Sequence, residues 1–173
     1  DAGAIRLAGG HLQYVGDGEV SDRRIIVASS GQLTVDGGGP LTLTDVVNSG
    51  GAAKTLNING VSAFDTTITS NLDGPLSVVL TAAHGDSTGQ RRDSSATGRF
   101  ILTGSNSSTG TLRIQAGSLG IGSDYAANFG TLHLATTEGS AGLFAVGADR
   151  TVPATTTILW ERRASQVDNI TVF

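Results

Sequence analysis

Residues 98–123 read GRFILTGSNSSTGTLRIQAGSLGIGS, and this stretch decides the fold. Apolar and small polar residues alternate along it, the alternation restarts at glycines, and the only charges are Arg99 and Arg113. Period-two alternation is typical of β-strands that bury one face, and glycine permits sharp bends between strands. Arg113 and Gln115 are expected to face outward. The side chains expected to face the interior are Leu102, Leu112, Ile114, Leu119 and Ile121.

The same pattern recurs along the whole chain. Short segments that are apolar at every second residue are bounded by Gly, Asn, Asp or Pro, and no segment has a convincing 3.6-residue period. Such segments are strands joined by turns, so the chain is predicted to be all-β. A G-x-L-x-(aliphatic) unit recurs at residues 31–35, 110–114, 117–121 and 130–134, with a proline variant at 74–78.

Many short strands at regular spacing are compatible with a sandwich, a closed barrel or a solenoid. Aromatic residues make up only 5% of the sequence, whereas sandwich cores usually contain large aromatic side chains. The recurring unit places two aliphatic residues inward in each copy, and like residues would stack from turn to turn. The sequence therefore predicts a parallel β-helix, a β-solenoid, with a β-sandwich as the alternative.

Length and composition restrict the class of protein. The 173 residues predict a single solenoid domain over residues 1–173, and the absence of an initiator methionine suggests a fragment of a longer secreted chain. The net charge is −4 and the arginines are scattered, which argues against nucleic acid as a partner. No apolar run is long enough to span a bilayer, so we expect a chain that is not embedded in a membrane. Without cysteine there is no disulfide scaffold and no thiolate metal site.

The opening stretch resembles the autotransporter-associated β-strand repeat, in which a leucine-rich strand is followed by TGxNxYTGGT, a short strand and xGTLxLG. The aromatic residue of that pattern is replaced by Ser107 or Ser108 here, and the double glycine is reduced to Gly110. The resemblance implies a right-handed parallel β-helix in the passenger region of a bacterial autotransporter or a similar large surface protein. The matching residues are Leu102, Thr103, Gly104, Asn106, Thr109, Gly110, Ile114, Ala116, Gly117, Leu119 and Gly122.

Residues 82–98 form the least patterned segment and are predicted to be an exposed loop. The loop contains two acids that flank two arginines, namely Asp86, Arg91, Arg92 and Asp93. Carbohydrate-active enzymes on β-helices use such residues, but a charged exposed loop is the more common origin of this grouping. We expect these four residues to be a binding site, and we assign no catalytic residue.

No metal or cofactor is expected. Asp17, Glu19 and Asp22 could offer three carboxylates to calcium, but an EF-hand loop would need a glutamate where this chain has Ala28. The three histidines have no second ligand at metal spacing, and His133 alternates with leucines as an outward strand residue would. The sequence contains no G-x-S-x-G elbow and no glycine-rich phosphate motif.

Two further features suggest surface roles. The pairs Thr42 with Thr44 and Thr67 with Thr69 resemble the threonine ladder of an ice-binding face, but such a ladder should recur in every turn and two pairs are too few. The sole tryptophan, Trp160, is expected to cover the open end of the stacked core, because terminal turns of a solenoid need atypical residues. Sugar stacking is the alternative for Trp160.

Taken together, these features predict a structural or adhesive passenger segment, located extracellularly or on the bacterial cell surface. Its expected partner is a host or neighbouring-cell surface molecule or a polysaccharide. The oligomeric state is left open. The alternatives are a carbohydrate-active enzyme and a phage-type fibre or tailspike segment on the same scaffold.

Overall fold

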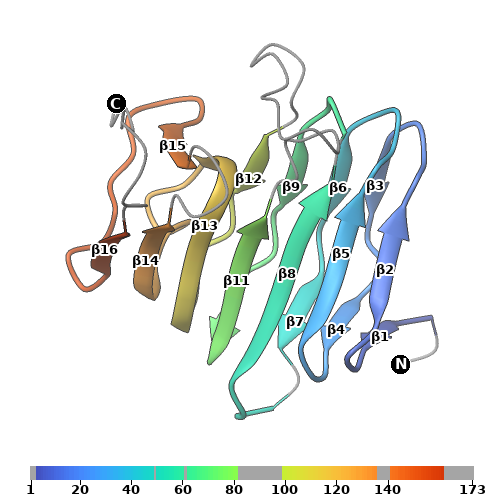
Figure 1. Ribbon diagram of the computed structural model, residues 1–173, viewed down its shortest axis with the longest axis horizontal. Helices are drawn as coiled ribbons and strands as arrows, with labels where there is room; N and C mark the ends of the chain where they lie inside the picture. Colours follow the sequence, from blue (N-terminus) through green and yellow to red (C-terminus); the bar gives the residue numbers. More distant parts are fainter. Residues whose placement is uncertain (1–2, 49, 61, 82–98, 136–140, 162–173) are drawn as a thin grey trace.

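The computed structural model describes residues 3–48, 50–60, 62–81, 99–135 and 141–161. All regular elements among these residues are β-strands, and strands of successive turns pair in parallel (Figure 1). The fold is a parallel β-helix, which confirms the predicted solenoid and excludes the sandwich. Among the described residues, the first strands, β1–β3, and the last strand, β16, lie at opposite ends of the stack (Figure 1).

Three parallel sheets form the walls. Sheet A contains β1 (Ile5–Leu7), β4 (Ile25–Val27) and β7 (Val46–Asn48). Sheet B contains, in order, β2 (His11–Tyr14), β5 (Gly31–Val35), β8 (Lys54–Gly60), β11 (Leu76–Thr81), the first part of β13 (Ser107–Ile121), β14 (Phe129–Ala135) and β16 (Thr157–Glu161). Sheet C contains β3 (Glu19–Ser21), β6 (Leu41–Leu43), β9 (Thr66–Ile68), β12 (Phe100–Leu102), the last part of β13 and β15 (Ala141–Ala145). The short β10 (Asp73–Gly74) pairs with the start of β13.

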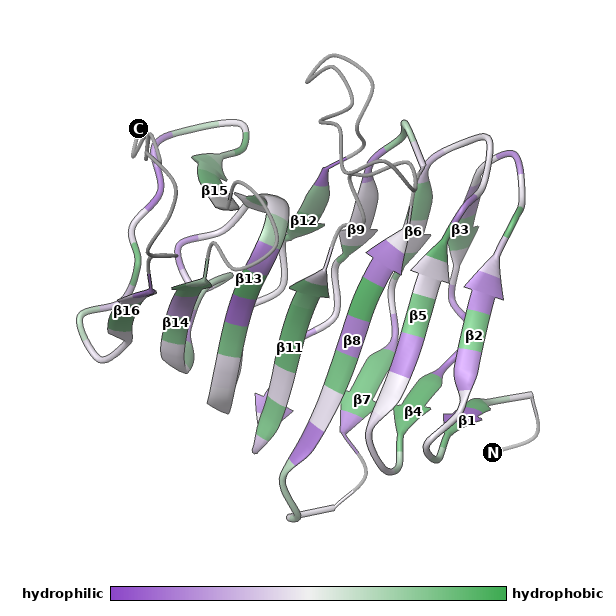
Figure 2. Cartoon of the chain, in the orientation of Figure 1, coloured by the Kyte–Doolittle hydropathy of each residue, from purple (hydrophilic) through white to green (hydrophobic). Residues whose placement is uncertain are grey.

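The core is a set of apolar ladders that run along the axis of the solenoid. The strand register of sheet B stacks inward residues of the same kind, in the order Leu33, Ile58, Leu80, Ile114 and Leu134. All five are buried. Figure 2 shows the resulting alternation of apolar and polar bands along β8, β11 and β13. Each turn therefore buries its apolar face against its neighbours, as in other solenoids.

Residues 99–123 behave as their alternation predicted. They contain β12 and β13, and the five side chains expected to face inward are all buried. Arg113 and Gln115 point outward and are half-buried. β13 passes from sheet B to sheet C without a connecting loop, because Gly117 turns the corner with φ of +95°. That backbone conformation strongly favours glycine.

The TGxN portion of the same stretch forms the preceding corner. Asn106 is 2% exposed, its Oδ1 accepts a bond from Leu72 N at 2.8 Å, and its Nδ2 donates to Ala126 O at 2.6 Å. A Cβ on Gly104 would collide with the carbonyl oxygen of Ser70 in the turn below. Asn106 therefore links neighbouring turns through hydrogen bonds, while Gly104 lets their backbones approach closely.

Candidate functional site: the outer face of sheet B

The outer face of sheet B runs across more strands than that of sheet A or sheet C in the described part of the chain. Its central row, aligned by strand register, consists of His11, Gln32, Asn57, Val79, Arg113, His133 and Leu159. A second row, here called the hydroxyl row, consists of Thr55, Ser77, Thr111, Thr131 and Thr157. Strands of a sheet lie about 4.8 Å apart, so these rows present polar groups at a regular interval, interrupted in the central row by Val79 and Leu159.

Near β2, β5 and β8, the face is held by bonds between its own side chains. Thr34 Oγ1 lies 2.6 Å from His11 Nε2 and donates to Asn59 Oδ1 at 2.5 Å. The Thr34 hydroxyl therefore links three turns, through His11 of β2 and Asn59 of β8. Gln32 Nε2, in the same strand as Thr34, also donates to Thr34 Oγ1, at 3.1 Å. Because these amides and hydroxyls already hold one another, their orientations are fixed before any partner arrives.

Around β13, β14 and β16, the face carries three ionisable side chains close together. Glu161 Oε2 lies 3.1 Å from His133 Nε2 and 3.5 Å from Arg113 Nη2. Nε of Arg113 is buried and has no hydrogen-bond partner among the described residues. This cluster, Arg113–His133–Glu161, combines an anion, a cation and an imidazole on one flat surface. It can exchange hydrogen bonds with hydroxyl, amide or carboxylate groups.

The local sequence gave no signal for this cluster. His133 was predicted to be an outward strand residue, and it is one, with 18% of its side chain exposed. Glu161 lies 28 residues further along the chain, and only the register of β14 with β16 brings the two together. The spacing between turns varies too much for that register to be read from the sequence.

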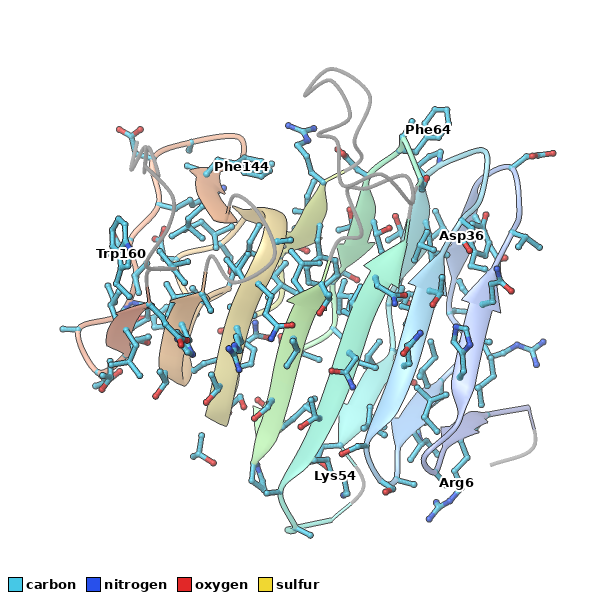
Figure 3. The ribbon with its side chains drawn as sticks, in the orientation of Figure 1. Arg6, Asp36, Lys54, Phe64, Phe144 and Trp160 are labelled. Atoms are coloured by element: carbon cyan, nitrogen blue, oxygen red, sulfur yellow. The ribbon has the colours of Figure 1, made fainter. Side chains whose placement is uncertain are left out.

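A second polar group lies at the corner between sheets B and C. Arg99 holds Asp65 with two bonds, Nε to Oδ1 at 3.0 Å and Nη2 to Oδ2 at 2.6 Å. These bonds lower the pKa of Asp65 below its usual value and raise that of Arg99. The guanidinium also lies 5.2 Å from the ring centroid of Phe144. Figure 3 shows Phe64 and Phe144 along this same rim.

The hollow beside this corner is small. It is lined in part by Asn59, Ser62 and Phe64, and it has about 40 Å³ of room, enough for a few water molecules. Pockets for small organic ligands are roughly ten times larger. The corner therefore joins two turns through an ion pair, and it does not enclose a ligand.

The predicted binding residues Asp86, Arg91, Arg92 and Asp93, and the loop 82–98 that carries them, lie outside the described residues. Within the described part of the chain, no group of three or more His, Asp or Glu side chains is arranged to hold a metal ion, and Asp17, Glu19 and Asp22 form none. The described residues also contain no helix long and apolar enough to cross a membrane.

The threonine pairs lie closer together than the sequence suggested. Thr42 of β6 pairs with Thr67 of β9 on the outer side of sheet C, in adjacent turns. The row does not continue as threonine, because Val20 precedes Thr42 and Ile101 follows Thr67. The threonine row therefore spans only two turns, which is too short for a ladder that recurs in every turn.

Trp160 lies in β16, at the end of the stack (Figure 3). It pairs in register with Leu134, so it continues the inward ladder into the last described turn. Half of its surface is nevertheless exposed.

Comparisons with known proteins identify no relative of this chain. No protein-family model matches it, and neither a curated protein nor a solved structure does. Function therefore has to be argued from the residues and their arrangement.

Proposed function

We propose that this chain is a structural and adhesive passenger segment of a bacterial cell-surface or secreted protein, of the kind that carries autotransporter-associated β-strand repeats. The observation that supports this most is the outer face of sheet B, a regular polar surface that extends over β2, β5, β8, β11, β13, β14 and β16. A rigid, flat surface with many hydrogen-bonding groups and few charges suits the binding of an extended partner.

The nature of the face points to the kind of partner. Amides and hydroxyls dominate the rows, and the Arg113–His133–Glu161 cluster is nearly balanced in charge, with Arg113 beside Glu161. Such a surface favours neutral or weakly charged partners that both donate and accept hydrogen bonds. We propose a polysaccharide or a glycosylated molecule on a host or neighbouring cell, met outside the bacterium.

Binding to an immobilised panel of bacterial and host-cell polysaccharides tests this proposal. Thr111→Arg places a bulky charge in the middle of the hydroxyl row and is expected to abolish binding. Thr67→Arg is the matched control, because it makes the same change on the outer side of sheet C. Binding that survives Thr111→Arg, or that is lost equally in both variants, would contradict the assignment to sheet B.

A carbohydrate-active enzyme is the second candidate, and the Arg113–His133–Glu161 cluster is the observation that favours it. A carboxylate hydrogen-bonded to an imidazole can pass a proton, and an adjacent arginine can hold an anionic sugar. If this candidate is correct, the chain will cleave a polysaccharide and Glu161→Gln will abolish cleavage without abolishing binding. Binding without turnover across the panel supports the adhesive role instead.

A further inference from the structure

The outer face of sheet B contains one row whose side chains already bond to one another. This row, here called the amide row, lies two residues further along each strand than the central row and consists of Gln13, Thr34, Asn59, Thr81 and Gln115. Gln13 Nε2 donates to Asp36 Oδ2 at 2.7 Å, and Thr81 Oγ1 donates to Gln115 Oε1 at 2.9 Å. Thr34 likewise donates to Asn59. A ligand over the amide row would have to break bonds within the protein before it gained any.

The hydroxyl row, on the other side of the central row, has its hydrogen-bonding groups open. No described residue bonds to the hydroxyl groups of its four threonines, Thr55, Thr111, Thr131 and Thr157, and all four are at least partly exposed. The hydroxyl of Ser77 accepts a bond from Thr111 N at 3.0 Å and still has its own hydrogen to donate. A ligand over the hydroxyl row therefore replaces water and breaks no bond of the protein.

The direction and spacing of the hydroxyl row restrict what can lie on it. Its five hydroxyls come from β8, β11, β13, β14 and β16, which lie side by side (Figure 1). At about 4.8 Å per strand, the row spans roughly 19 Å along the axis of the solenoid. An extended peptide presents side chains of one face roughly every 6.6 Å, which does not match this interval. The sugars of a straight β-1,4-linked glycan repeat at nearly the strand spacing and carry hydroxyls along the edges of the chain.

We propose that the hydroxyl row binds a straight, neutral β-1,4-linked glycan, which runs parallel to the solenoid axis with about one sugar over each strand from β8 to β16. The row exchanges hydrogen bonds with the edges of the sugars, while Val79 and Leu159 of the adjacent central row contact their apolar faces. A neutral chain fits because the row itself carries no charge. This inference rests on the proposed function, since it names the class of polysaccharide and the part of sheet B that holds it.

Calorimetric titration of the full chain with oligosaccharides of defined length tests the proposal without any variant. The probes are β-1,4-linked oligomers of glucose and of N-acetylglucosamine, and at least one series should bind. Its affinity should rise with each added sugar up to about five and gain little from a sixth, because the row ends there. Glucose oligomers with α-1,4 linkages have the same composition but coil, so they should bind about tenfold more weakly or worse.

Two matched variants locate the ligand on the face. Thr131→Val removes one hydroxyl of the hydroxyl row at nearly constant volume and is expected to weaken binding about two- to tenfold. Thr81→Val makes the same change in the amide row, where the hydroxyl already bonds to Gln115, and should change the affinity by less than about twofold. Both variants should keep the far-ultraviolet circular dichroism of the natural chain.

Several outcomes overturn this inference and leave the broader proposal standing, because a polysaccharide still binds. They are an affinity that does not depend on oligomer length, equal or tighter binding of the α-1,4-linked series, and equal effects of Thr131→Val and Thr81→Val. Failure of both β-1,4-linked series while another glycan of the panel binds has the same meaning. The absence of binding to every glycan overturns both proposals.

Discussion

Ile114 and Ile158 are both inward isoleucines of sheet B, on adjacent ladders, yet Ile114 is fully buried while Ile158 is more than half exposed. The strands that carry them, β13 and β16, have the same alternation and the same parallel pairing. They differ in the number of neighbouring strands. β13 has a neighbour on each side, whereas β16 pairs only with β14 among the described strands. Burial in this molecule is therefore supplied by adjacent turns and is not a property of a strand alone.

The largest expected effect comes from removing the same atoms at both positions. Ile114→Ala should lower the free energy of unfolding by about 2–5 kcal/mol, because it leaves a cavity between packed ladders. Ile158→Ala should cost only about 1 kcal/mol, because more than half of Ile158 is already exposed to solvent. Urea unfolding of the two variants measures the difference. Equal losses would show that the end of the stack is as tightly packed as the middle.

A smaller effect is expected from the asparagines that link the turns. Asn106→Ala would leave Leu72 N and Ala126 O without their partner in a buried corner, at a cost of about 1–3 kcal/mol. Asn71 is the matched control: its Oδ1 also accepts a backbone bond, from Ser105 N at 2.8 Å, but it is exposed. Because water can replace that bond, Asn71→Ala should cost clearly less in the same unfolding experiment.

Asn106 also begins an N-x-S glycosylation sequon with Ser107 and Ser108, and its burial bears on that sequon. Its amide nitrogen is engaged with Ala126 O and the residue is almost fully enclosed, so the folded chain offers no glycan attachment point there. Both motif residues therefore have a structural role: Gly104 allows close approach of two backbones, and Asn106 bonds to two neighbouring segments.

Strand identity and the inward residues of 98–123 could be predicted because the alternation has a period of two and the glycines mark its breaks. The register could not. Gly117 turns one corner within a single strand, whereas five residues, 36–40, lie between β5 and β6. Because the length of the corners varies in this way, the proximity of Arg113, His133 and Glu161 could not be predicted from the sequence.

The smallest effect is expected at the surface, where Asp65 and Arg99 join neighbouring turns. Arg99 lowers the pKa of Asp65 from its usual 3.8, so this contribution is fully present above the unfolded pKa and is lost as the pH falls through the lower folded pKa. The pair is exposed to solvent and screened by salt, which limits it to about 0–1 kcal/mol. The stability difference between the natural chain and Asp65→Asn, measured against pH, should vanish in acid.

That comparison has a clear contrary outcome. If Asp65→Asn destabilises the chain as much at acidic pH as at neutral pH, the ion pair is not the source of the difference. High salt provides an independent check, because it should shrink the effect of this substitution while leaving that of Ile114→Ala in place.

Native-state hydrogen exchange of the whole chain tests the dependence of each turn on its neighbours most directly. Amides of β8, β11 and β13 should exchange most slowly, and protection should fall toward β1–β3 at one end and β16 at the other. This gradient follows from ladders that gain a neighbour on each side only in the middle of the stack. Uniform protection along the solenoid, or faster exchange in β13 than in β16, would contradict the account.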